Sequence, residues 1–153
     1  MSENNINKLE EILKEKPNDL SAMVSLGNLY LDEKRFQDAE NIWNKAGEKG
    51  SAEAFYNLGV LYGMIYLKDI AEDELWELHS DEEMWFEKAE IAYKASLDID
   101  KSNTHALKNL ATLYTERGQK KDAIALLEKI IDISNDKDLI KEINEEINEI
   151  KSL

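Results

Sequence analysis

Apolar residues return every three or four positions along most of the chain, which is the periodicity of amphipathic α-helices. On three of these predicted helices a leucine, a small residue and a tyrosine recur, followed by an alanine and, four places later, a large apolar residue. The three sets are Leu26-Gly27-x-x-Tyr30 with Ala39 and Trp43, Leu58-Gly59-x-x-Tyr62 with Ala89 and Tyr93, and Leu110-Ala111-x-x-Tyr114 with Ala123 and Leu127. Each set predicts a pair of antiparallel helices.

The small residues of the first set, Gly27 and Ala39, lie twelve positions apart. We expect these two residues to face each other where the helices come closest, because a bulky side chain at either place would push the helices apart. The third set keeps this spacing, whereas thirty positions separate Gly59 from Ala89. The middle pair therefore carries about eighteen additional residues between its helices.

Helix pairs of this kind bury their apolar faces only by stacking on one another, so the pattern predicts one all-α domain over residues 1–153. Its expected parts are an N-terminal capping helix over residues 3–16, repeat 1 over 20–50, repeat 2 over 52–98, repeat 3 over 104–133 and a C-terminal capping helix over 137–152. An inserted segment at about 67–84 interrupts repeat 2, and its capping signatures predict a short helix over about 70–78.

The three motifs resemble the tetratricopeptide repeat (TPR) family, which places Leu-Gly-x-x-Tyr on the first helix of a repeat and Ala-x-x-x-aromatic on the second. The junction Lys45-Ala46-Gly47-Glu48-Lys49-Gly50 is similar to the related Sel1-like repeats. The resemblance implies a right-handed α-α superhelix, a TPR-like solenoid of about three helix pairs with a capping helix at each end. It also implies a non-enzymatic adaptor or scaffold for protein-protein interaction.

In this family the first helices of successive repeats line a concave groove that binds a peptide or a helix. The motif places these side chains on the groove: Asn28, Tyr56, Asn57, Lys108, Asn109 and Thr112. An asparagine amide both donates and accepts, so Asn57 and Asn109 are either contacts for a peptide backbone or ordinary solvated residues. Family members that bind an acidic chaperone tail use basic residues where this chain has Val24, His105 and Asn109, so such a tail is not the expected ligand.

Composition narrows the class of partner. The chain has 153 residues, a net charge of −14, one proline and no cysteine. The negative charge repels nucleic acid and anionic membrane surfaces, and favours a basic peptide or protein domain as the partner. Residues 1–5 lack the basic and apolar regions of a secretory signal, which favours a cytoplasmic location.

Two segments could also mediate self-association. The inserted segment is acidic and carries Trp76, Trp85 and Phe86, which are either packing anchors or an exposed surface for a partner or a second copy. The last predicted helix has Ile140, Ile143, Ile147 and Ile150 at spacings of three, four and three. This stripe suits a capping helix or a short dimer seam. A structural protein that assembles as a homo-oligomer is therefore the alternative function.

Residues that could carry catalysis are sparse. The two histidines, His79 and His105, lie in different repeats, and the neighbours in His79-Ser80-Asp81 point in different directions at a helix start. The acidic inserted segment lacks the glycine-punctuated loop of a helix-loop-helix calcium site. We therefore expect no catalytic residue, no metal site and no cofactor.

Overall fold

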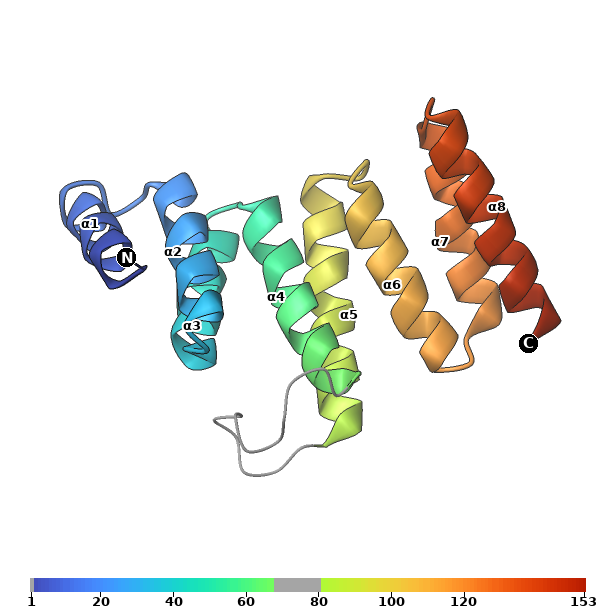
Figure 1. The fold of residues 1–153 in the computed structure, drawn as a ribbon, viewed down its shortest axis with the longest axis horizontal. Helices are drawn as coiled ribbons and strands as arrows, with labels where there is room; N and C mark the ends of the chain where they lie inside the picture. The colour runs from blue at the N-terminus through green and yellow to red at the C-terminus, as the bar shows by residue number, and fades with distance from the viewer. Residues whose placement is uncertain (1, 68–80) are drawn as a thin grey trace. The chain divides into compact units, whose positions relative to one another are not determined.

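The computed structural model describes residues 2–67 and 81–153, and every regular element within those ranges is an α-helix (Figure 1). The helices are α1 (Ser2–Glu15), α2 (Leu20–Asp32), α3 (Phe36–Glu48), α4 (Ala52–Tyr66), α5 (Glu82–Ile99), α6 (Thr104–Glu116), α7 (Lys120–Ile133) and α8 (Lys137–Ser152). The all-α prediction is confirmed. The helix predicted over residues 70–78 lies outside the described residues.

Two compact units divide the chain: Met1–Ile99 holds α1 to α5, and Asp100–Leu153 holds α6 to α8. In the first unit each helix packs on the next one along the chain, from α1 to α5. In the second unit α6 packs on α7, and α7 packs on α8. Within each unit, packing of a helix on its chain neighbours is the arrangement of a helical repeat protein, which the sequence pattern predicted.

Local sequence signals fix where the first helix of each pair begins. One side chain before each helix accepts a hydrogen bond from a backbone N–H of the first turn: Asp19 from Ala22 (2.9 Å), Ser51 from Ala54 (3.1 Å) and Asn103 from Ala106 (3.0 Å). Each bond satisfies an N–H group that has no partner within its helix. Short polar residues at these positions therefore start α2, α4 and α6.

The turn inside a helix pair uses a left-handed residue at equivalent positions of repeats 1 and 3. Lys34 has a φ of 57° and Gly118 a φ of 74°. The next residue then donates its backbone N–H to the carbonyl of the motif tyrosine, at 2.7 Å for Arg35 to Tyr30 and 2.8 Å for Gln119 to Tyr114. This conformation is easy for Gly118 and strained for Lys34, because the Cβ of a lysine crowds the backbone there.

Each helix pair of the first unit closes with a glycine against an aromatic ring. A Cβ built on Gly59 would lie 2.6 Å from Cδ1 of Tyr93, and one built on Gly27 would overlap the indole of Trp43. The side chain nearest to Gly27 is thus the ring of Trp43, four places after Ala39. A glycine is needed because the ring occupies the space that a Cβ would take.

The third pair has smaller partners at the equivalent positions. Ala111 replaces the glycine and Leu127 replaces the aromatic residue, and both are completely buried. A leucine is less bulky than an indole or a phenol ring, so the helix opposite can carry a Cβ. The exchange of glycine for alanine therefore follows the exchange of an aromatic residue for leucine.

Candidate functional site

The exposed side of α2 and α4 presents eight residues at helical spacing, which we call the α2–α4 stripe. On α2 they are Ser21, Ser25, Asn28 and Asp32, and on α4 they are Glu53, Asn57, Val60 and Met64. The four on α2 and Glu53 are exposed, whereas the other three on α4 are partly buried. Two carboxylates and no basic side chain belong to this stripe.

Two of the predicted groove residues meet in the α2–α4 stripe. The Nδ2 atom of Asn57 donates a hydrogen bond of 3.0 Å to Oδ1 of Asn28. Within the described residues this bond leaves the N–H groups of Asn28 and the carbonyl oxygen of Asn57 available. Together they offer donors and an acceptor side by side, which is the pattern that one peptide group of a bound segment can satisfy.

Tyr56 is anchored rather than freely exposed. Its ring is half-buried and lies 6.1 Å from the ring of Tyr93 on α5, with an interplanar angle of 53°. Val24, at the equivalent position on α2, is only 4% exposed. Val24 therefore belongs to the core and not to the exposed surface.

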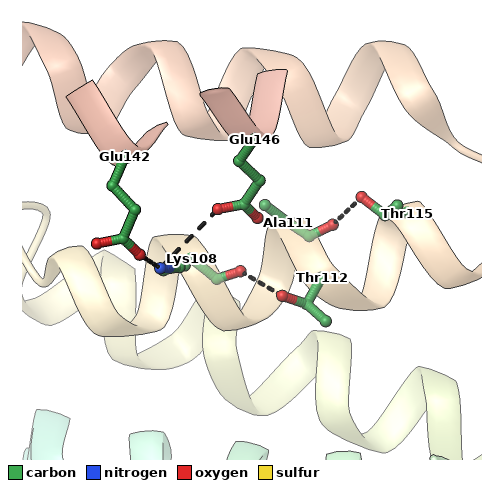
Figure 2. A network of polar contacts seen from close by, with 6 residues as sticks. All are labelled: Lys108, Ala111, Thr112, Thr115, Glu142 and Glu146. Atoms are coloured by element: carbon green, nitrogen blue, oxygen red, sulfur yellow. Dashed lines mark hydrogen bonds and ion pairs between the residues drawn. The ribbon is translucent and has the colours of Figure 1, made fainter. Parts of the chain in front are cut away.

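In the second unit, the predicted groove residue Lys108 is held by α8 (Figure 2). Its Nζ atom pairs closely with Glu142 and lies 3.9 Å from Oε2 of Glu146. Burial raises the pKa of Glu146, and the Lys108 charge opposes that increase. The only basic groove residue predicted from the sequence thus has its charge compensated by two glutamates.

The other two groove candidates on α6 differ in exposure. Thr112 is exposed, and its hydroxyl donates a 3.1 Å hydrogen bond to the carbonyl of Lys108 (Figure 2). Asn109 is partly buried. The roles of Glu142 and Glu146 were missed because their partner Lys108 is 34 positions away from Glu142 in the sequence. Two glutamates one helical turn apart are nevertheless a visible signal for a bridged lysine.

The aromatic residues at the start of α5 belong to the core. Trp85 is 1% exposed, and its ring centroid lies 6.0 Å from that of Tyr62. Phe86 is 5% exposed, and its ring centroid lies 5.6 Å from that of Tyr66. The interpretation of Trp85 and Phe86 as an exposed binding surface is therefore wrong, because α5 packs its first two turns against α4. Trp76 lies outside the described residues.

Sequence reasoning also missed a cluster around the motif tyrosine of repeat 2. The hydroxyl of Tyr62 donates a 2.6 Å hydrogen bond to Glu40 on α3. Nζ of Lys88 lies 3.7 Å from the same carboxylate oxygen, 4.7 Å from the ring centroid of Trp85 and 5.3 Å from that of Tyr62. The cation thus lies over two rings and beside a carboxylate, which ties α3, α4 and α5 together.

Repeat 1 has a similar arrangement. The hydroxyl of Tyr30 donates a 2.7 Å hydrogen bond to Glu10 on α1, and the Arg35 guanidinium lies 4.3 Å from the Tyr30 ring centroid. Burial and the neighbouring Glu10 raise the pKa of Tyr30 to about 12. In both repeats the motif tyrosine joins its helix to the helix before it.

Potential metal ligands are dispersed over the described part of the chain. Nowhere in residues 2–67 and 81–153 do three His, Asp or Glu side chains converge as metal ligands would. A hollow of about 280 Å³ is lined by Tyr30, Asp38, Asn41, Ile42 and Lys45, which include no histidine, serine or threonine. His105 is exposed, and His79 lies outside the described residues. None of the helices in these ranges is both long enough and apolar enough to traverse a bilayer.

Comparisons with known proteins agree with the repeat pattern. The family model described as tetratricopeptide repeat matches residues 104–135. No curated protein sequence matches the chain significantly. The Sel1-like character of the junction after residue 45 stays a prediction.

Solved structures share the fold over most of the chain. A crystal structure of MamA protein is 27% identical, with a TM-score of 0.61, and the match covers 84% of this chain and 61% of that one. A thermophilic TPR protein of Thermus thermophilus is 17% identical with a TM-score of 0.65, over 95% of this chain and 70% of that one. Pseudomonas aeruginosa pilF is 12% identical with a TM-score of 0.63, and the match covers 94% of this chain and 63% of that one. This chain thus spans less than two thirds of the first of these structures. The family model thus shows one tetratricopeptide repeat over residues 104–135, and the solved structures show a similar helical fold over most of the chain.

Proposed function

We propose that the chain is a non-enzymatic adaptor that holds a segment of a partner protein on the α2–α4 stripe. Tetratricopeptide repeats serve protein-protein interaction, which supports the general role. The observation that carries the site is the hydrogen bond between Asn57 and Asn28. It fixes two amides side by side with donors and an acceptor still available for a peptide backbone.

Charge supports a basic partner. Residues 1–99 contain 22 Asp or Glu and ten Lys or Arg, a balance of −12, whereas residues 100–153 contain eleven and nine, a balance of −2. The negative charge is thus concentrated in the unit that holds the α2–α4 stripe. Opposite charge speeds the encounter of two proteins more than it deepens their affinity, so association should slow as salt rises.

The second unit offers fewer contacts for such a partner. Lys108 already pairs with two glutamates of α8, so it is a weak site for an acidic ligand. Asn109 and Thr112 on the same helix stay candidate contacts. We therefore assign the main binding role to α2 and α4.

Self-assembly is less well supported than partner binding. Three isoleucines of the predicted dimer seam, Ile143, Ile147 and Ile150, are at most 5% exposed within one chain. Trp85 and Phe86 are buried as well. Sedimentation of the purified chain at several concentrations tests this alternative, since only a self-assembling protein forms larger species as its concentration rises.

The proposed function is tested by recovering the native partner with the wild-type chain and with an Asn28→Ala/Asn57→Ala variant. Two lost hydrogen bonds of about 1 kcal/mol each should weaken the affinity for a specific partner about thirtyfold and lower its recovery. Asn44→Ala is the matched control, because Asn44 is an exposed asparagine on α3, outside the stripe. Equal recovery with all three proteins would place the binding site elsewhere.

A further inference from the structure

The α2–α4 stripe changes character along α4. Glu53 lies exposed in the first turn, Asn57 lies in the middle, and Val60 and Met64 follow as partly buried apolar residues. Leu67, directly after the helix, is 38% exposed and extends the apolar end. An apolar area beside polar residues on a protein surface is typical of a contact site for another molecule.

The length of this gradient fits a short peptide segment. Glu53 and Met64 are eleven positions apart, which is roughly 16 Å along a helix and about five residues of an extended chain. Asn57 lies between them, about 6 Å along the axis from Glu53. A segment whose backbone bonds the asparagine pair can therefore reach both ends of the stripe with side chains a few residues apart.

We propose that the α2–α4 stripe selects a segment in which a lysine or arginine and a large apolar residue are separated by about three to five residues. This inference rests on the proposed function and specifies its partner. The cationic side chain lies beside Glu53, and the apolar side chain lies on Val60 and Met64. Met64 suits this role because the flexible thioether side chain adapts to apolar groups of different shape.

The charge of the neighbouring helix adds a second condition. Asp32 is exposed at the C-terminal end of α2, and none of the eight stripe residues is basic. An acidic side chain in the bound segment would meet a carboxylate at either end of the stripe, without a stripe cation to offset it. The selected segment should therefore contain few or no acidic residues.

The inference can be tested by selecting binders from a displayed library of random 12-residue peptides against the full chain. Binders of the wild-type chain should be enriched in the spaced basic and apolar pair and poor in acidic residues. A Glu53→Lys variant should select acidic residues in place of the basic one and keep the apolar residue. A Val60→Ser/Met64→Ser variant should lose the apolar preference and keep the basic one, with circular dichroism showing whether it remains folded.

The affinity of one selected peptide gives a second, quantitative measurement. Glu53→Lys should weaken its binding about threefold to tenfold at low salt, as expected for reversal of one exposed charge pair. Changing the basic residue of the peptide to glutamate should restore binding to that variant. Glu48→Lys on the exposed side of α3 is the matched control, and it should leave affinity and selection unchanged.

Failures of the two proposals are distinguishable. If the wild-type chain selects no peptide, or if Asn28→Ala/Asn57→Ala selects the same peptides with the same affinity, the proposed function fails. If peptides bind through the asparagine pair but show no spaced basic and apolar residues, only the present inference is overturned. An unchanged preference in the Glu53→Lys variant overturns it as well.

Discussion

The contact between Gly27 and Trp43 provides a sensitive test of how the helix pairs are closed. In Gly27→Ala the new methyl group would overlap the indole, which is 1% exposed and donates its Nε1–H to the Val24 carbonyl at 3.3 Å. A buried, hydrogen-bonded ring cannot move aside easily, so overpacking should cost about 1–3 kcal/mol. Alanine improves helix propensity by about 1 kcal/mol. The net loss of unfolding free energy should therefore be at most about 2 kcal/mol.

The effect of Gly27→Ala on the unfolding free energy should change sign when the Trp43 ring is removed. In a Trp43→Leu background the overlap is gone, as it is for Ala111 and Leu127 in repeat 3, and only the gain in helix propensity remains. Gly27→Ala should then stabilise the protein by up to about 1 kcal/mol, although Trp43→Leu alone destabilises it by roughly 2–4 kcal/mol. The double-mutant cycle should therefore show a coupling of about 2 kcal/mol.

Urea denaturation followed by circular dichroism at the helical band measures the unfolding free energies of the wild type, the two single variants and the double variant. Ser25→Ala is the control for helix propensity, because Ser25 is exposed on the same helix as Gly27. Equal destabilisation by Gly27→Ala in both backgrounds would refute the idea that the indole excludes a Cβ at this position.

Four further predictions concern single residues. Lys34→Gly should raise the unfolding free energy by about 0.5–1 kcal/mol, because φ at Lys34 is 57°. Lys49→Gly is the control and should bring no such gain, because φ at Lys49 is −89°. The midpoints of urea denaturation of the two variants measure the difference. The pKa of Tyr30 is about 12 in the folded state and about 10 in the unfolded state. The neutral hydroxyl should therefore stabilise the fold fully below pH 10, and this contribution should be lost as the pH rises towards 12. Melting temperatures measured across this pH range should show the loss, and Tyr30→Phe should abolish it. Trp85→Ala should cost about 3–5 kcal/mol, since the ring is 1% exposed; stability unchanged in urea would contradict its burial. Lys108→Met should lower the unfolding free energy by at most about 1 kcal/mol, because the Lys108 side chain is 35% exposed. A larger loss in urea denaturation would show that Lys108 is coupled more strongly to α8.

Local signals predicted the helices well. Short polar residues such as Ser51 start a helix through their own backbone, and the spacing of Leu58, Gly59 and Tyr62 reflects contacts within one helix pair. The sequence therefore carries these features within windows of about thirty residues, which is the size of one repeat.

Features that depend on distant segments could not be predicted in the same way. The sequence shows that Trp85 is a large aromatic residue, but whether it is exposed depends on how α5 packs against α4 after the inserted segment. Lys108 on α6 similarly pairs with Glu142 on α8, although the two residues are 34 positions apart in the sequence. In the candidate site, the pairing of Asn28 with Asn57 follows from the packing of consecutive repeats, while the chemistry of each amide is evident from its residue type.

The tyrosine-to-glutamate bonds have a consequence for how a chain of this kind gains and loses repeats over evolution. Tyr30 reaches back to Glu10 and Tyr62 reaches back to Glu40, so each helix pair depends on the helix that precedes it. Deleting α1 would free the Tyr30 hydroxyl, which water can hydrate, but it would also uncover the core around the buried Ile6. Excising an internal helix would instead remove the acceptor from beneath a covered ring and leave a buried hydroxyl unsatisfied. A repeat is therefore best preserved by changes that leave the preceding helix in place, such as the lengthened connection between α4 and α5.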